Sequence, residues 1–264
     1  MLPTAPDTAA TEDRVSQRLR LIAPLQSWGV SSLFDTLDTA HEPSRSGVIG
    51  LMAGALGRDR TEDISDLSRL SFGVRVDMPG TLLRDYQTAQ ARDGKSNDAQ
   101  VARYYLQDAA FWVALEGDAD LLAQVARALQ DPVYPTSLGR RNCQPSVPLL
   151  SPADGDGPLP GVPLLSALRE APSLRRPAFW DTLERWQGHD QQTLYRLVLD
   201  RRLVPVDERG PWQPSRQQDV PVAPFSERCF RMRDILSRSV PLTLIPDPFL
   251  HRHALKTEPA LETA

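Results

Sequence analysis

The chain has 264 residues, of which 41% are hydrophobic, and its formal net charge is −4. A chain of this length holds one large domain or two small ones. The negative balance excludes nucleic-acid binding through a uniformly basic surface, so local groups of basic residues would have to carry any such binding. No apolar run reaches the roughly 20 residues of a membrane-spanning helix, and we expect no membrane partner.

The sequence favours a reduced, cytoplasmic setting. Cys143 and Cys229 are its only cysteines, and they form no Cys-x-x-Cys pair. Residues 1–17 lack the apolar run of a signal peptide, and we expect them to form a disordered leader. All but two of the 30 basic residues are arginine. Arginine suits bidentate contacts with phosphate, although biased codon usage would give the same excess.

The first predicted elements are a strand, a loop and a helix. We expect the strand over residues 18–23 and the helix over residues 46–56, with an exposed Trp28 in the loop after the strand. The free N–H groups and the dipole of a helix start favour anions near Arg45 and Ser46. An aromatic ring nearby can stack on a base. These residues therefore predict a phosphate-binding site, unless Arg45 is a solvated helix-end residue and Trp28 a core residue.

A long β-hairpin is the next predicted feature. Residues 70–76 alternate apolar with polar side chains, which predicts a half-buried strand. Residues 81–115 contain two strand-like segments around the polar stretch 91–102, which predicts a hairpin with a projecting tip. Basic and aromatic residues interleave on this ribbon, which suits single-stranded nucleic acid. Tyrosine is, however, also common in ordinary strands.

The order of elements predicts an α+β fold. Asp118 is expected to cap a helix that runs to Gln130. One strand more would complete a ferredoxin-like (RRM-like) sheet with helices on one face. Proline is absent from residues 81–131 and frequent afterwards, so we expect a partly irregular C-terminal region of short strands. Within it we expect a helix over 177–187 and strands at 193–199 and 220–231.

The expected organisation has four parts. The leader over 1–17 precedes a ferredoxin-like domain over 18–150, which includes the hairpin 81–115. A smaller β or irregular region follows over 151–235, and a tail over 236–264.

Little in the sequence predicts catalysis. Of the four histidines, His251 and His253 have metal-ligand spacing, but no third ligand is evident, so we expect neither metal nor cofactor. His41 precedes Arg45 and could act as a general base on a ribose hydroxyl, or it is an ordinary surface histidine.

A compact cationic turn is a better candidate for binding. Gly139 precedes Arg140 and Arg141, and a glycine allows the backbone to approach a phosphate closely. A solvated pair of charges would have the same sequence.

Several segments also follow one another in a specific order and spacing. They are PLQSWG (24–29), EPSRSGVIGLMAGALGR (42–58), FGVRVDMPGTLLRDYQTAQ (72–90), RYYLQDAAFWVALEG (103–117) and YPTSLGRRNCQP (134–145). Together they resemble the CasD family, the Cas-five-type subunit of the type I-E CRISPR Cascade complex. The resemblance is strong over residues 18–150 and weaker over 160–235.

The resemblance implies that residues 18–150 form an RRM-like RNA-binding domain. It further implies a subunit that serves antiviral defence by binding the 5′ handle of the CRISPR RNA with a thumb hairpin. The implied partners are that RNA, the backbone Cas-seven-type subunit and the large Cas-eight-type subunit, with target DNA reached only through the complex. It also implies no catalysis, because a separate Cas-six-type nuclease cuts the precursor RNA in type I-E systems. Type I-C relatives cleave RNA with a Tyr, Lys and His set that has no residue-by-residue match here.

Residues expected to contact RNA lie in the first loop, at the helix start, on the hairpin and in the cationic turn. They are Gln26, Ser27, Trp28, Arg45, Ser46, Arg84, Thr88, Gln90, Arg103, Tyr104, Gly139, Arg140 and Arg141. Two alternatives stay open: a metal-independent endoribonuclease that uses His41 and Arg45, and a module that only docks other subunits.

Overall fold

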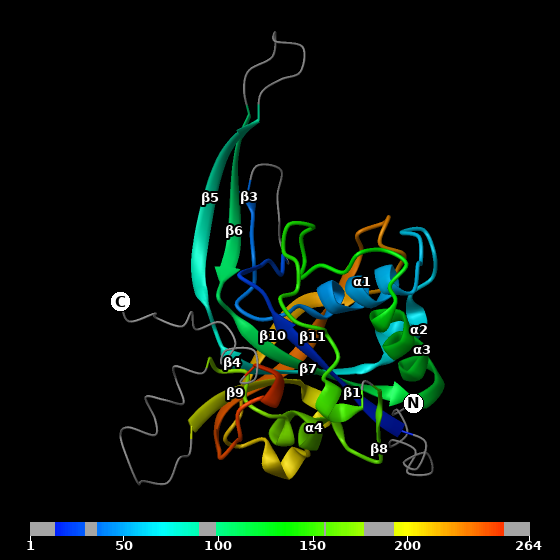
Figure 1. The fold of residues 1–264 in the computed structure, drawn as a ribbon, viewed down its shortest axis with the longest axis vertical. Coiled ribbons are helices and arrows are strands. Elements are labelled where there is room, and N and C mark those ends of the chain that lie inside the picture. The colour runs from blue at the N-terminus through cyan, green and yellow to red at the C-terminus, as the bar shows by residue number, and fades with distance from the viewer. Residues whose placement is uncertain (1–13, 30–35, 90–98, 156, 177–192, 251–264) are drawn as a thin grey trace, which may run out of the picture.

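A computed structural model of the chain describes residues 14–29, 36–89, 99–155, 157–176 and 193–250. It shows a central sheet with helices packed on it, and a long hairpin that projects from one end (Figure 1). Within the described residues, no helix is long and apolar enough to cross a membrane.

The central sheet has seven strands, and all its neighbouring strands are antiparallel. They are β1 (Arg14–Ile22), β4 (Ser71–Met78), β7 (Ala110–Asp118), β8 (Leu159–Pro160), β9 (Thr193–Asp200), β10 (Gln213–Pro221) and β11 (Phe230–Leu242). Their spatial order is β10-β11-β9-β4-β7-β1-β8. The helices are α1 (Arg45–Ala55), α2 (Ser65–Arg69), α3 (Ala119–Gln130) and α4 (Leu164–Glu170), with short 3-10 turns η1 (Pro152–Asp154), η2 (Arg201–Leu203) and η3 (Val206–Glu208).

The order β1-α1-β4-β7-α3-β8 follows the βαββαβ order of a ferredoxin-like fold, with β8 reduced to two residues. The predicted α+β class is confirmed. Strand β9 pairs with β4, so β9, β11 and β10 extend the sheet beyond this unit. One sheet therefore crosses the boundary expected at residue 150.

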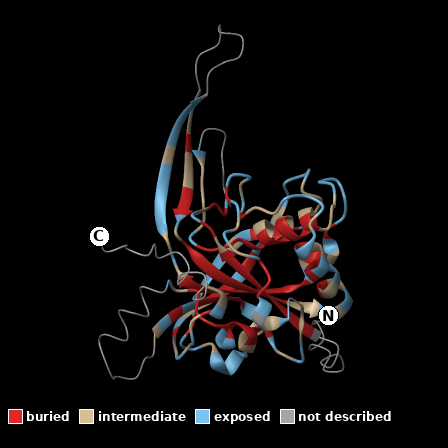
Figure 2. Ribbon diagram, viewed as in Figure 1, coloured by how far each residue is buried: buried red, intermediate tan, exposed pale blue. Residues whose placement is uncertain are grey.

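The middle strands of the sheet, β4 and β7, are buried along most of their length (Figure 2). Along β7, Phe111 and Val113 belong to the core under α1 and α3, whereas Trp112 belongs to a second core with Leu164 and Leu168 of α4. Figure 1 shows α4 on the side of the sheet away from α1. The expectation of helices on one face is therefore wrong for α4, because alternate side chains of β7 are apolar on both faces and each face needs a cover.

Local signals placed the first two long helices correctly. Ser44 caps α1 by accepting a hydrogen bond from the N–H of Gly47 at 3.3 Å. Asp118 caps α3 by accepting from the N–H of Leu121 at 2.8 Å, as predicted.

The two ends of the described chain are more ordered than expected. Strand β1 begins at Arg14, inside the expected leader, and its Ser16 and Gln17 are buried. Strand β11 runs for 13 residues to Leu242, so the expected tail does not begin at 236. The strand expected at 220–231 is instead the end of β10, a turn and the start of β11. The helix expected over 177–187 lies outside the described residues.

The projecting hairpin consists of β5 (Thr81–Ala89) and β6 (Ala99–Gln107), and we call it the thumb. Two short strands pair with the other edge of β6: β2 (Leu25–Gln26) near its base and β3 (Thr36–Leu37) near its middle. The thumb ends at Gln107, earlier than the predicted residue 115, because the next strand, β7, joins the central sheet. The turn before β5 needs Gly80, whose φ is +72° and where a Cβ would lie 2.6 Å from the carbonyl oxygen of Gln107.

Candidate nucleic-acid interface

The thumb carries its predicted side chains on two faces. Arg84 lies opposite Tyr104 and Thr88 opposite Gln100 in the β5–β6 pair. Opposite residues share a face, as do residues two apart along a strand. Arg84, Thr88 and Tyr104 therefore lie on one face, and Arg103 lies on the other.

The first face is open to solvent along β5. Arg84 and Thr88 are exposed, and Tyr86 is 54% exposed. The guanidinium of Arg84 lies 5.5 Å from the ring of Tyr86. An aromatic ring with a cation beside it is the combination that single-stranded nucleic-acid binders use. Gln90, the last predicted residue of β5, lies outside the described residues.

The second face of the thumb meets the cationic turn. The guanidinium of Arg140 stacks 4.7 Å from the ring of Tyr105 and donates to the carbonyl oxygen of Leu37 at 2.8 Å. Asn142 donates to the hydroxyl of Tyr105 at 3.2 Å. Burial raises the pKa of Tyr105, but these donors outweigh it and the pKa is lowered. Arg140 thus holds the turn in contact with β3 and with the thumb.

A glycine is needed at position 139 because another backbone segment of the protein lies against it. The φ of Gly139 is +95°, and a Cβ there would lie 1.6 Å from the carbonyl oxygen of Ser27. The N–H of Ser27 also donates to the carbonyl oxygen of Leu138 at 3.0 Å, which ties the first loop to the turn. Ser27 is itself buried, and its hydroxyl donates to the carbonyl oxygen of Tyr104. The close approach predicted at Gly139 is therefore made to another backbone segment.

Trp28 is a core residue. Its side chain is 1% exposed, and its indole N–H donates to the side-chain oxygen of Gln26 at 3.1 Å. The ring packs against α1, where a Cβ at Gly47 would lie 2.8 Å from it. Gln26 is buried as well and donates to the carbonyl oxygens of Leu21 and Ala109. The expected exposure of Trp28 is wrong, because Gln26 satisfies the one polar group of the indole and allows it to be buried.

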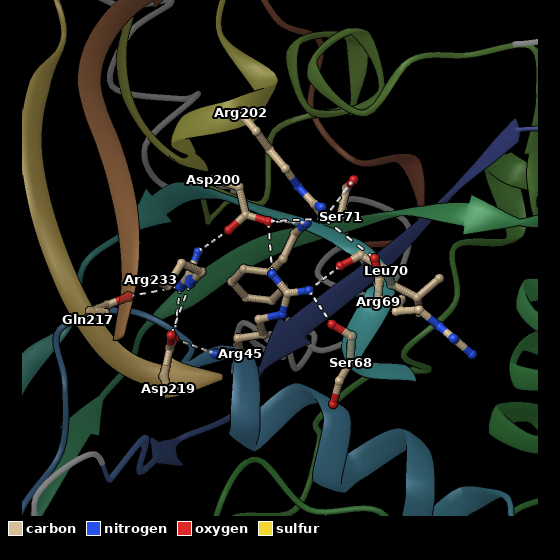
Figure 3. Close-up of polar contacts among 11 residues, drawn as sticks. Arg45, Ser68, Arg69, Leu70, Ser71, Asp200, Arg202, Gln217, Asp219 and Arg233 are labelled. Carbon is tan, nitrogen blue, oxygen red and sulfur yellow. Dashed lines mark hydrogen bonds and ion pairs between the residues drawn. The ribbon is translucent and has the colours of Figure 1, made fainter. Parts of the chain in front are cut away.

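Arg45 belongs to a buried ion-pair network (Figure 3). Its guanidinium donates to Asp200 at 2.9 Å, to the carbonyl oxygen of Ser68 at 2.7 Å and to that of Leu70. Its backbone N–H donates to Asp219 at 2.8 Å. Burial, opposed by Asp200, lowers the pKa of Arg45. The first N–H of α1 and the Arg45 side chain, both expected to meet a phosphate, are held by carboxylates of the protein.

Arg233 joins the same network from β11. It donates to Asp219 at 2.9 Å and to Asp200 at 2.7 Å, and its side chain is 5% exposed. Asp200 ends β9, and Asp219 lies on β10. The C-terminal strands thus supply the charges that bury the start of α1, which no local sequence signal predicted.

A groove beside α1 brings together three predicted residues. It has a volume of about 550 Å³ and is lined by Ser46, Gly139 and Arg141, and we call it the α1 groove. Arg141 is exposed, and its guanidinium makes no hydrogen bond within the described residues. Tyr134, 52% exposed, also lines this groove. The sequence analysis missed Tyr134, although it begins the segment that contains the cationic turn.

Metal-binding geometry is not found among the described residues, which contain no group of three or more His, Cys, Asp or Glu side chains suited to a metal ion. His251 and His253 lie outside this part of the chain.

Residues 18–235 match the model of the CRISPR-associated protein (Cas_Cas5) family. The chain belongs to the Cas5 family. The CRISPR system Cascade subunit CasD of Escherichia coli (strain K12) is 36% identical over 151 residues, which cover 50% of this chain and 67% of that protein. The predicted resemblance to the CasD family is confirmed.

Solved structures agree with this Cas5 assignment. One, described as a crystal structure of a Cas protein, is 38% identical with a TM-score of 0.65 and covers 88% of this chain and 98% of that one. Another, a chain of a CRISPR RNA-guided surveillance complex, is 26% identical with a TM-score of 0.66. This match covers 91% of this chain and 98% of that one. Both likenesses therefore cover most of this Cas5 chain.

Two surfaces of the Cas5 chain therefore present predicted residues to solvent: the open face of the thumb and the α1 groove. Four other predicted residues are buried in the protein. They are Gln26, Ser27, Trp28 and Arg45.

Proposed function

We propose that this chain is the CRISPR RNA-binding subunit of a type I-E Cascade complex and that it holds the 5′ handle of the RNA without cutting it. Its likeness to a Cascade subunit of E. coli and to a chain of an RNA-guided surveillance complex supports this role. The observation that carries it is the thumb, which projects from the body and exposes Arg84 beside Tyr86. A complex of this kind acts in the cytoplasm, which is where we place the chain.

RNA contacts in this proposal are local. Arg84, Thr88 and Tyr104 meet RNA on the open thumb face, and Ser46 and Arg141 meet it in the α1 groove. The bases stack on exposed aromatic rings while the arginines bind phosphates. A chain with a net charge of −4 can bind in this way, because only a few nucleotides are held and the neighbouring surfaces of the complex supply further contacts.

Protein partners are also proposed at the thumb. Leu82 is 51% exposed and Leu83 37% exposed, on opposite faces of β5. An exposed leucine on each face of a projecting ribbon offers an apolar contact to a protein surface on either side of it. We assign these contacts to the backbone Cas-seven-type subunit and the large Cas-eight-type subunit, and target DNA reaches the chain only through the complex.

The arrangement around Arg45 argues against the endoribonuclease alternative. That reaction needs a cation to stabilise the charge on the phosphorane. The side chain of Arg45 is 6% exposed, and its guanidinium is bound to Asp200 and two carbonyl oxygens. The other alternative is a module that only docks other subunits. That role would not account for the exposed Arg84–Tyr86 pair or for the exposed Arg141.

The test is the double variant Arg84→Ala/Arg141→Ala, assembled into the complex with guide RNA. Both side chains are exposed, so the fold should be kept. The loss of two phosphate contacts should lower RNA retention. It should also reduce the slope of log K against log salt concentration by about 1.4. The matched control is Arg127→Ala/Arg169→Ala, which removes two exposed helix arginines outside both surfaces.

Unchanged retention across a salt titration would count against the proposed RNA contacts. Incubation of the purified chain with repeat RNA in EDTA tests the enzymatic alternative. Site-specific cleavage that is lost in His41→Ala would replace the proposal with an endoribonuclease. A lack of crosslinking to guide RNA inside the complex would favour the docking role.

A further inference from the structure

A second cavity, of about 530 Å³, lies beside the Arg45 network, and we call it the arginine pocket. Its walls come from α2, from the end of β9 with η2, and from β11 (Figure 3). Only two acidic residues line it, Asp200 and Asp234. The arginines that line it are Arg45, Arg69, Arg201, Arg202, Arg209, Arg231 and Arg233.

The positive charge of the arginine pocket is not neutralised within the protein. Asp200 is already bound to the two buried arginines of the network. Asp234 pairs with Arg216 at 2.9 Å, outside the pocket. Arg69, Arg201 and Arg231 are exposed, and their guanidinium groups have no hydrogen bond or ion pair in the described part of the chain. An excess of positive charge therefore faces the cavity in a chain whose net charge is negative.

The wall of the pocket also holds unused buried donors. Arg45 is 5% exposed, and its Nε has no hydrogen-bond partner among the described residues. The hydroxyl of Ser68 is likewise buried without a partner there. Both atoms are closed off from solvent, so contact with a ligand in the pocket falls to the exposed arginines.

The shape of the pocket suits an extended ligand. A neighbouring hollow of about 240 Å³ shares Ser68, Arg69, Val220 and Arg231 with it. The two cavities adjoin at Arg69 and Arg231 and together make an extended groove, whose smaller part is also lined by Asp63. A chain of several anionic groups fits the arginine-lined part of this groove better than a single ion does.

The pocket is remote from the thumb. The amide of Phe72 donates to Asp200 at 3.1 Å, so the network lies at the start of β4. The thumb leaves from the other end of β4, after Met78. Eight residues of strand separate the two ends by roughly 25 Å.

We propose that the arginine pocket binds the phosphate groups of a nucleic-acid strand and is a second phosphate-binding site on this chain, separate from the thumb and the α1 groove. Guanidinium groups bind phosphodiester oxygens in bidentate fashion, and a strand offers such groups at regular intervals along the groove. This goes beyond the proposed function, because the strand held here is either a distant part of the guide RNA or DNA brought by the complex.

The test compares the wild-type full chain with Arg69→Ala/Arg231→Ala. Fluorescence anisotropy follows the binding of labelled single-stranded RNA, single-stranded DNA and double-stranded DNA over a salt titration. Loss of two phosphate contacts should weaken binding and lower the log–log salt slope by about 1.4 for single strands. The strand type that shows the larger change identifies the source of the phosphates.

Two further variants control the experiment. Arg127→Ala/Arg169→Ala removes as much exposed charge elsewhere and should leave the slope at its wild-type value. Arg69→Lys/Arg231→Lys keeps the charge and should keep most of the slope, which separates loss of charge from any other effect of the alanine substitutions. Both side chains are exposed, so the alanine variant should keep the fold, which far-UV circular dichroism checks.

An unchanged slope for all three nucleic acids in the pocket variant overturns the proposal, as does a wild-type chain that binds none of them. A third result would also overturn it: poly-glutamate binding that requires Arg69 and Arg231, together with nucleic-acid binding that does not. The pocket would then hold an acidic protein segment. The thumb double variant, measured for guide-RNA retention in the complex, tests the proposed function separately.

Discussion

Arg75 is fully buried. Its guanidinium donates hydrogen bonds to Asp77 at 2.7 Å and to the carbonyl oxygens of Leu168 and Ala171 at 2.6 and 2.7 Å. Arg233 is held by carboxylates in a similar way. Such arginines tie the sheet to α4 and to the start of α1, while Arg84 and Arg141 stay in solvent. At the residue scale, part of the arginine excess is therefore structural, a role that the sequence analysis did not consider.

The Asp200→Ala variant tests the buried network. It leaves Arg45 and Arg233 without the carboxylate that they share, and removal of one partner from a buried ion pair costs about 3–5 kcal/mol. We expect a loss of that size in the free energy of unfolding, measured by urea denaturation. Asp234→Ala breaks an exposed pair with Arg216 and should cost less than about 1 kcal/mol. Equal midpoints for the two variants would contradict a stabilising role for Asp200.

At the scale of elements, short-range signals were reliable where a cap or a periodicity marked the segment. Asp118 identified the start of α3, and alternation along residues 70–76 identified β4. The expectation that this strand is half-buried is wrong, because its polar residues, such as Arg75, are buried under α4. Strand β11 was missed because its stability comes from pairing on both edges, with β9 and β10, and not from its own pattern. Strand β10 lies at the edge of the sheet, which explains why it tolerates Pro214 and Pro221.

Helix α1 offers a matched pair of glycine substitutions. A Cβ at Gly50 would make an ordinary contact of 3.6 Å with Phe225, so Gly50→Ala should stabilise the protein by about 0.4–1 kcal/mol. A Cβ at Gly47 would lie 2.8 Å from the buried ring of Trp28, so Gly47→Ala should destabilise it by about 1–3 kcal/mol. Urea denaturation measures both. A gain in stability from Gly47→Ala would show that Trp28 is free to move.

At the scale of the whole molecule, the central sheet joins segments that the sequence analysis placed in separate regions. Strand β4 pairs with β7 on one side and with β9 on the other. Trp28 lies in the core on one face of this sheet and Trp112 in the core on the other. Because both cores share the same strands, neither can lose its packing alone.

We therefore expect a single cooperative unfolding transition for the described body of the chain. Tryptophan fluorescence and far-UV circular dichroism, followed over one urea titration, should give coincident curves. If fluorescence changed at a lower urea concentration than circular dichroism, the residues on either side of 150 would unfold as separate units.

Capping residues, alternation and the order of short segments determined, from the sequence alone, the Cas5 family, the α+β class and the presence of a thumb. Caps and alternation are recognised within a few neighbouring residues, and the family resemblance depends on the order of segments along the chain; none of these needs the fold. Only the tertiary structure decided which candidate residues face solvent. The carboxylates that bury Arg45 lie 155 and 174 residues away in sequence, at Asp200 and Asp219. Burial of a charge depends on the partner that folding brings to it, and nothing in the residues around Arg45 specifies that partner.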